Sequence, residues 1–95
     1  MSPAIVLLGD IGSDHDGFPP TPVIAASPDV LIDGKPVVRQ GDPLASHAKP
    51  KHAAHARVVA GGIASVLVNG RPVAVTGSQV DCAGVVIGSG SVEAG

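Results

Sequence analysis

An eight-residue pattern occurs twice in this chain, and it restricts the fold more than any other feature. Residues 30–37 read VLIDGKPV, and residues 66–73 read VLVNGRPV. The central Asp-Gly and Asn-Gly pairs are preferred in type I′ turns, because both central residues of such turns have positive φ. Each pair follows an apolar run rich in β-branched residues. The repeat therefore predicts two β-hairpins of the same design.

Weaker copies of this unit occur near both ends of the chain. Residues 24–30 are echoed by residues 86–92. A Gly-Asp or Gly-Ser pair occurs at three related places, Gly9-Asp10, Gly41-Asp42 and Gly77-Ser78. We expect three units, the last completed by the N-terminal segment, because such closure removes free strand edges. The expected fold is all-β: a small, cone-shaped, β-prism-like domain of short strands with pseudo-threefold repeats.

The composition agrees with this expectation and disfavours several classes of protein. Phe18 is the only aromatic residue, and 13 glycines and 9 prolines interrupt the chain. This mixture suits short strands and tight turns better than long helices. The net charge of −2 offers no basic surface for nucleic acid. We expect a single domain, residues 1–95.

The N-terminus lacks a basic segment, and its apolar run at residues 4–8 is too short for a signal peptide or a membrane span. We therefore expect synthesis in the cytoplasm without a signal peptide, and any export must use a route other than a standard signal. Residues 43–57 show no strand pattern and are expected to form a long loop. A loop of this length in a small domain usually needs something to hold it.

The histidines and the single cysteine are placed in phase with the repeat. His15 and His47 each lie five residues after the aspartate of a Gly-Asp pair, and Cys82 lies four residues after the serine of the Gly-Ser pair. In a threefold arrangement these three positions converge, and His55 can fold back across the loop as a fourth donor. His52 is out of phase and is expected to be a surface residue or a substitute ligand.

Three imidazoles and one thiolate form a closed tetrahedral set that suits one structural Zn²⁺ ion. Structural zinc contributes about 10–16 kcal/mol of apparent binding free energy in small zinc domains, so it can serve as a staple. Taken singly, each histidine also fits a solvated loop residue, and the cysteine fits a small buried residue. Catalysis is poorly supported, because Glu93 is the only glutamate and no nucleophile elbow or phosphate-binding loop is present.

Together these features resemble the PAAR family. Its core pattern corresponds to the repeated V-x-[IV]-[DN]-G-[KR]-P-V segment followed by Gly-Asp. The Pro-Ala-Ala-Arg stretch that names the family corresponds to residues 36–39 (PVVR) and 72–75 (PVAV). The similarity extends over essentially the whole chain. The second unit departs from the pattern at Val75, in place of arginine, and at Ser78, in place of aspartate, and we expect this to remove a polar bracing contact.

The resemblance implies a non-enzymatic structural protein with one zinc ion held near the apex by His15, His47, His55 and Cys82. It implies that the base caps a trimeric spike, VgrG-like in type VI secretion or central in a contractile phage tail, with one copy per trimer. Cargo effectors and transient contact with a target membrane are also implied. Many relatives carry toxic extensions, and we expect this chain to lack an effector extension. The protein would leave the cell through the machine or form part of a virion tail. The alternatives are a zinc-stabilised adaptor that docks on another trimeric protein and a minimal zinc hydrolase.

Overall fold

The computed structural model describes residues 2–14 and 16–95, and over these residues it contains strands and no helix. The described strands pair as four two-stranded antiparallel sheets, β1-β2, β3-β4, β5-β6 and β7-β8. Their bounds are β1 Ile11–Gly12, β2 Thr21–Pro22, β3 Leu31–Ile32, β4 Lys35–Pro36, β5 Pro43–Lys49, β6 His52–Val58, β7 Ile63–Val68 and β8 Arg71–Val73. The predicted all-β class is confirmed. None of the described residues lies in a helix that could cross a membrane.

Three chain segments meet at the centre and define a pseudo-threefold axis. The amide of Val6 donates to the carbonyl of Ala74 at 2.9 Å, that of Ala74 to Val38 at 3.0 Å, and that of Val38 to Val6 at 2.9 Å. All three residues are fully buried. A second ring of hydrogen bonds is formed by the amides two residues further along each segment. The amides of Leu8, Gln40 and Thr76 donate to the carbonyls of Pro36, Pro72 and Ala4, respectively. The predicted pseudo-threefold repeat is therefore present.

The two predicted hairpins are also present, at β3-β4 and β7-β8. Asp33 and Asn69 have φ values of 55° and 53°, and the glycines that follow them have φ values of 76° and 78°. These are the values that a type I′ turn requires. The third unit has no such hairpin. Instead, Ala4 bridges to Glu93, and the Ile5 amide donates to the Val92 carbonyl at 3.0 Å. The N-terminal segment thus completes the third unit, as expected.

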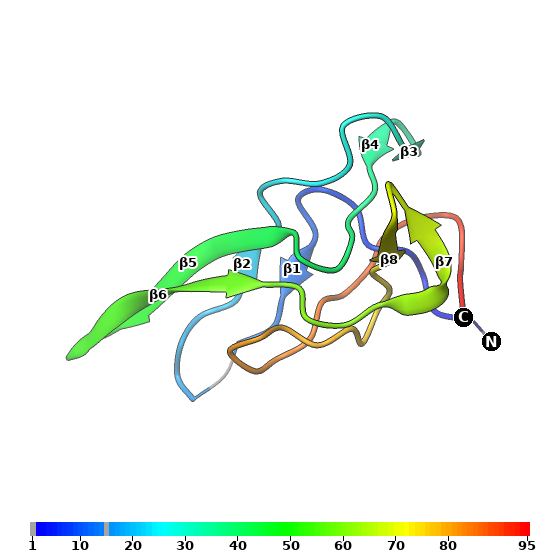
Figure 1. Ribbon diagram of the computed structural model, residues 1–95. Helices are drawn as coiled ribbons and strands as arrows, with labels where there is room; N and C mark the ends of the chain where they lie inside the picture. The colour runs from blue at the N-terminus through cyan, green and yellow to red at the C-terminus, as the bar shows by residue number, and fades with distance from the viewer. Residues whose placement is uncertain (1, 15) are drawn as a thin grey trace.

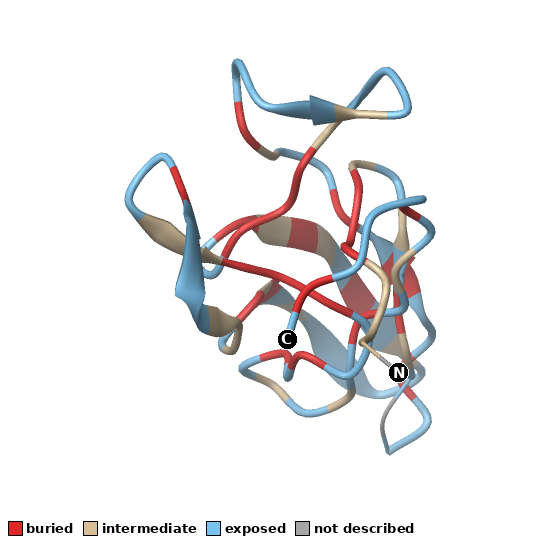
Figure 2. Cartoon of the chain, turned by 90° about the vertical axis from the view of Figure 1, so that its right-hand side faces the viewer, coloured by how far each residue is buried: buried red, intermediate tan, exposed pale blue. Residues whose placement is uncertain are grey.

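Small aliphatic side chains fill the interior in two neighbouring clusters. The first surrounds the threefold axis and contains Val6, Val23, Val38, Leu44, Val59, Ala74, Val80 and Val86. The second lies beneath the hairpins and contains Ile5, Leu7, Val37, Val68, Val73, Val75 and Ala94. Figure 2 views the molecule from the end that carries the β3-β4 and β7-β8 hairpins. In this view buried residues cluster around the centre, and exposed residues occupy the loops and turns around them. The narrow interior explains why valine and alanine replace aromatic residues there.

The prediction of a long loop at residues 43–57 is wrong. Here β5 and β6 form the longest hairpin, which projects from one end of the molecule (Figure 1). Lys51 lies in its turn with φ 69°. The strands carry alanine at many exposed positions and few β-branched residues, so β propensity did not indicate them. The molecule measures 39 × 27 × 21 Å and tapers toward this hairpin (Figure 1).

Candidate metal centre

Each of the three units turns away from the axis through the same braced turn. The amides of Leu7 and Arg39 donate to the carboxylates of Asp10 and Asp42, both at 2.8 Å. In the unit that contains the β7-β8 hairpin, the amide of Val75 donates to the hydroxyl of Ser78 at 3.0 Å. Serine therefore keeps the backbone contact, and only a side-chain ion pair like that between Asp42 and Arg39 is missing. Each turn begins one of three segments, residues 11–22, 43–58 and 79–85. We call these segments the tip loops, although the first contains β1 and β2 and the second is the β5-β6 hairpin.

The tip loops bring three of the proposed ligands together. His47 on β5 pairs directly with His55 on β6, and their Nε2 atoms lie 2.7 Å apart. Cys82, from the third tip loop, places its Sγ 3.7 Å from His47 Nε2. One donor atom from each side chain falls within 4.8 Å of the other two. His47 is buried, and His55 and Cys82 are half-buried. This group can hold a metal ion.

The hydrogen bond on the other side of the His47 ring determines which nitrogen faces the cluster. Nδ1 lies 2.8 Å from the Pro19 carbonyl oxygen. A carbonyl only accepts, so Nδ1 carries the proton, and Nε2 presents the lone pair that a metal ion binds. Histidine ligands commonly donate their second nitrogen to a carbonyl or carboxylate in this way, which orients the ring.

The donor atoms also match the requirements of zinc. Two imidazole nitrogens on one tetrahedral zinc ion lie about 3.3 Å apart, and a nitrogen and a sulfur about 3.6 Å apart. The separation of 3.7 Å between sulfur and His47 already agrees with this. The two histidine nitrogens need to open by only about 0.6 Å, which small rotations of two rings can supply. Two nitrogens and a thiolate favour zinc over hard cations such as Mg²⁺ or Ca²⁺.

The lone aromatic residue covers this cluster, which the sequence did not indicate. The Phe18 ring centroid lies 4.9 Å from that of His47 and 4.6 Å from that of His55. The ammonium group of Lys49 lies 4.7 Å from the Phe18 centroid. Phe18 thus limits the access of water to the two histidines. Its position three residues after His15 was the only signal available.

Of the remaining two histidines, the structure describes only His52. His15, the fourth expected ligand, lies outside the described residues. His52 is exposed and does not belong to the ligand cluster. Its ring packs edge-on against Phe18 with centroids 5.7 Å apart. The expectation that His52 is a surface residue therefore agrees with its position.

Arg57 is a second residue that sequence reasoning missed. It is fully buried and lies two positions after His55 on β6, so both side chains project to the same face of the strand. The guanidinium donates to the Ser13 carbonyl at 2.7 Å and to the Thr21 hydroxyl at 3.1 Å. Its spacing from His55 could have suggested this position, but only if residues 52–58 had been recognised as a strand.

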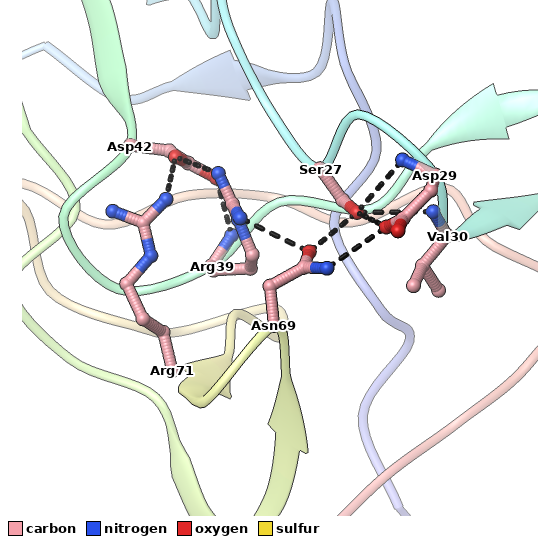
Figure 3. Close-up of polar contacts among 7 residues, drawn as sticks. All are labelled: Ser27, Asp29, Val30, Arg39, Asp42, Asn69 and Arg71. Atoms are coloured by element: carbon pink, nitrogen blue, oxygen red, sulfur yellow. Dashed lines mark hydrogen bonds and ion pairs between the residues drawn. The ribbon is translucent and has the colours of Figure 1, made fainter.

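A separate polar network joins the first two units, away from the ligand cluster. Asp42 accepts hydrogen bonds from the side chains of Arg39 and Arg71 at 2.9–3.0 Å (Figure 3). Arg39 also donates to Asn69 Oδ1 at 3.0 Å, and Asn69 donates to Asp29 at 2.8 Å. Its hydrogen bond to Asp42 raises the pKa of Arg39. Hydrogen bonds from Asn69 and Ser27 lower the pKa of Asp29. The network braces the fold.

Comparison with protein families gives one match. A family model described as the PAAR motif matches residues 14–88. The match spans all three tip loops from residue 14 onward and both hairpins. No curated protein matched the chain.

Proposed function

Because the chain belongs to the PAAR motif family, which points to a spike-tip role in contractile injection systems, we propose that it caps the end of a trimeric spike. The spike would be VgrG-like or the central spike of a phage tail, with one copy of the chain per trimer. When the sheath contracts, the tip would concentrate force on a small area of membrane. The role is mechanical and requires no enzymatic activity.

The observation that carries this proposal is a set of exposed apolar residues with threefold placement. Val30, Val66 and Val92 occupy equivalent positions in the three units and are 36%, 37% and 48% exposed. Beside them, Leu31 and Leu67 are 56% and 59% exposed. We call these five residues the base surface. Strands β3 and β7, which contain Leu31 and Leu67, lie at the end of the molecule opposite the β5-β6 turn (Figure 1).

This pattern fits a partner with true threefold symmetry. A symmetric trimer presents the same patch three times, so one bound chain must offer three similar patches. Exposed apolar groups of this kind commonly mark interaction sites. Glu93 occupies the position in the third unit that leucine occupies in the other two, as its bridge to Ala4 indicates. The third contact would therefore be more polar than the first two.

We further propose that His15 joins His47, His55 and Cys82 around one structural Zn²⁺ ion. The cluster of three donors supports this ligand set, as does the carbonyl that orients His47. A closed set of four protein ligands leaves no position for a catalytic water, which argues against a zinc hydrolase. The ion would stabilise the tapered end, where the described part of the chain has little hydrophobic core.

Binding to a purified VgrG-type spike trimer tests the docking proposal. We expect one chain per trimer by analytical ultracentrifugation or native mass spectrometry. Replacing Leu31 and Leu67 together with aspartate should weaken binding roughly 100-fold or more, because it places two charges in an apolar contact. The control variant changes Ile11 and Val85 to aspartate; both are exposed apolar residues outside the base surface.

Unchanged affinity in the Leu31 and Leu67 variant would contradict the proposed base surface, and so would equal loss in the control. A zinc-stabilised adaptor would use the same surface on a different trimer. It would be favoured if the chain failed to bind spike trimers at all.

A further inference from the structure

Arg57 is an unusual residue for the interior of a small domain. Its side chain is completely buried. No carboxylate within the described ranges forms an ion pair with it, and its Nε has no hydrogen-bond partner. A buried charge without a counterion is costly unless several hydrogen bonds stabilise it. A position that retains such a group needs a structural reason.

The hydrogen bonds of Arg57 supply that reason, because they reach all three tip loops. Arg57 itself belongs to the second loop. Nη1 donates to the carbonyl of Gly12 at 3.3 Å and Nη2 to that of Ser13 at 2.7 Å, both in the first loop. Nη2 also donates to the carbonyl of Ala83 at 3.5 Å, in the third loop. One guanidinium therefore connects the three segments that carry the proposed ligands.

Each contact lies close to a proposed ligand along the chain. Ala83 follows Cys82 directly, and Arg57 lies two residues after His55. The third loop approaches closely because it has glycine at residue 84. A β-carbon there would lie 2.9 Å from the Ser13 carbonyl oxygen and 3.2 Å from Arg57 Nη2. The loops thus close around the guanidinium.

We propose that Arg57 is a positioning residue for the metal centre, one that holds the three tip loops together before the ion binds. This inference rests on the ligand set proposed above. The guanidinium is a fixed charge that needs no ion to keep its contacts. Loops that are already ordered lose less conformational entropy when the ion binds, so affinity rises without any direct contact between Arg57 and the metal.

Metal competition against a chromophoric chelator tests the proposal in the full chain. Replacing Arg57 with methionine should weaken zinc and cobalt binding about 10- to 100-fold, the usual effect of removing a group that orients ligands. The cobalt-loaded variant should keep its thiolate charge-transfer band, because the ligands are unchanged. The matched control is Arg39→Met, which also removes a buried arginine but lies in the separate Asp42 network. Its metal affinity should equal that of the wild type.

Equal metal affinity in the Arg57→Met variant and the wild type would overturn the inference, as would equal losses in the Arg57 and Arg39 variants. If the methionine variant does not fold, Arg57→Lys can be used instead, because it keeps the charge but has fewer hydrogen-bond donors. It should also lose metal affinity, but less than is expected for methionine. Hydrogen exchange on the metal-free wild type gives an independent test. The amides of Ser13 and Ala83, which bond to Val85 and Val80, should remain protected. Rapid exchange at both would also refute the role.

Failure of this inference can be told apart from failure of the ligand set. If wild-type protein with cobalt lacks the thiolate band, the ligand set is wrong. If the band is present and Arg57→Met binds cobalt as tightly as the wild type does, only the role of Arg57 is wrong.

Discussion

At the scale of single residues, the pseudo-threefold repeat places different side chains in the same backbone setting. Asp10, Asp42 and Ser78 brace equivalent turns, yet only Asp42 contacts arginine side chains among the described residues. Of its two arginine partners, Arg39 is buried. The molecule therefore provides its own control for separating the backbone brace from the ion pair.

Replacing Asp42 with asparagine should destabilise the fold by about 3–5 kcal/mol, because Arg39 loses its buried counterion. Asp10→Asn changes the same turn without stranding an arginine. It should cost only about 1 kcal/mol, the usual value for weakening a few hydrogen bonds. Urea unfolding of both variants measures the difference. Equal destabilisation would show that the turn, and not the ion pair, is what Asp42 stabilises.

At the scale of elements, both type I′ turns are tied to a neighbouring unit. Asp33, in the turn between β3 and β4, accepts from the amide and the hydroxyl of Ser91 at 2.9 and 2.7 Å. Asn69, in the corresponding turn between β7 and β8, accepts from the Ser27 hydroxyl at 2.6 Å. The turn residues thus fix the backbone and also lock adjacent units together.

The hydrogen bonds from Ser91 to Asp33, which hold the C-terminal segment against the β3-β4 turn, should be sensitive to acid. Hydrogen bonds from Ser91 hold the pKa of Asp33 below its ordinary value of 3.8. A lowered pKa in the folded state means that the stabilisation is complete above pH 3.8 and is lost as the pH falls through the lower, folded value. In the Ser91→Ala variant the pKa of Asp33 should rise toward 3.8, as followed by NMR of the carboxyl carbon.

Asp29 is the internal control for this titration. Its pKa is also lowered, but by Asn69 and Ser27, which the Ser91 change leaves in place. The pKa of Asp29 should therefore not move. A shift of both carboxyls by the same amount would indicate a general loosening of the fold and contradict a local lock.

At the scale of the whole molecule, the hydrophobic core and the proposed metal centre stabilise different ends. The clustered aliphatic residues surround the axis and the region beneath the hairpins, whereas the tip loops hold the histidines and the cysteine. A domain of 95 residues has modest stability from its core alone. An additional staple at the tapered end is consistent with that size.

Removing the metal should lower the melting temperature by roughly 10 °C or more, since a loss of only 2 kcal/mol shifts a domain of this size by about that amount. Differential scanning calorimetry with and without a strong chelator measures the shift. Cys82→Ser should melt near the temperature of the chelated wild type, and chelator should then add little. Elemental analysis should confirm that the chelator has removed the metal. If the melting temperature is then unchanged, a structural role for the ion is contradicted.

Much of this architecture could be read directly from the chain. The Asp-Gly and Asn-Gly pairs specify positive φ at two successive residues, so the two hairpins were predictable from local chemistry. The three Gly-Asp or Gly-Ser pairs indicated the repeat, and their spacing from the histidines and Cys82 pointed to a shared site. These signals are readable because each acts within a few residues.

The tertiary structure alone decided the β5-β6 hairpin, the cover provided by Phe18 and the role of Arg57. The alanine-rich strands have weak intrinsic preference for β structure, and in their ladder His47 faces His55. The partners of Arg57 lie 26 to 45 residues away along the chain. Local preference cannot encode contacts over such distances, because they form only when the three units close around a common axis.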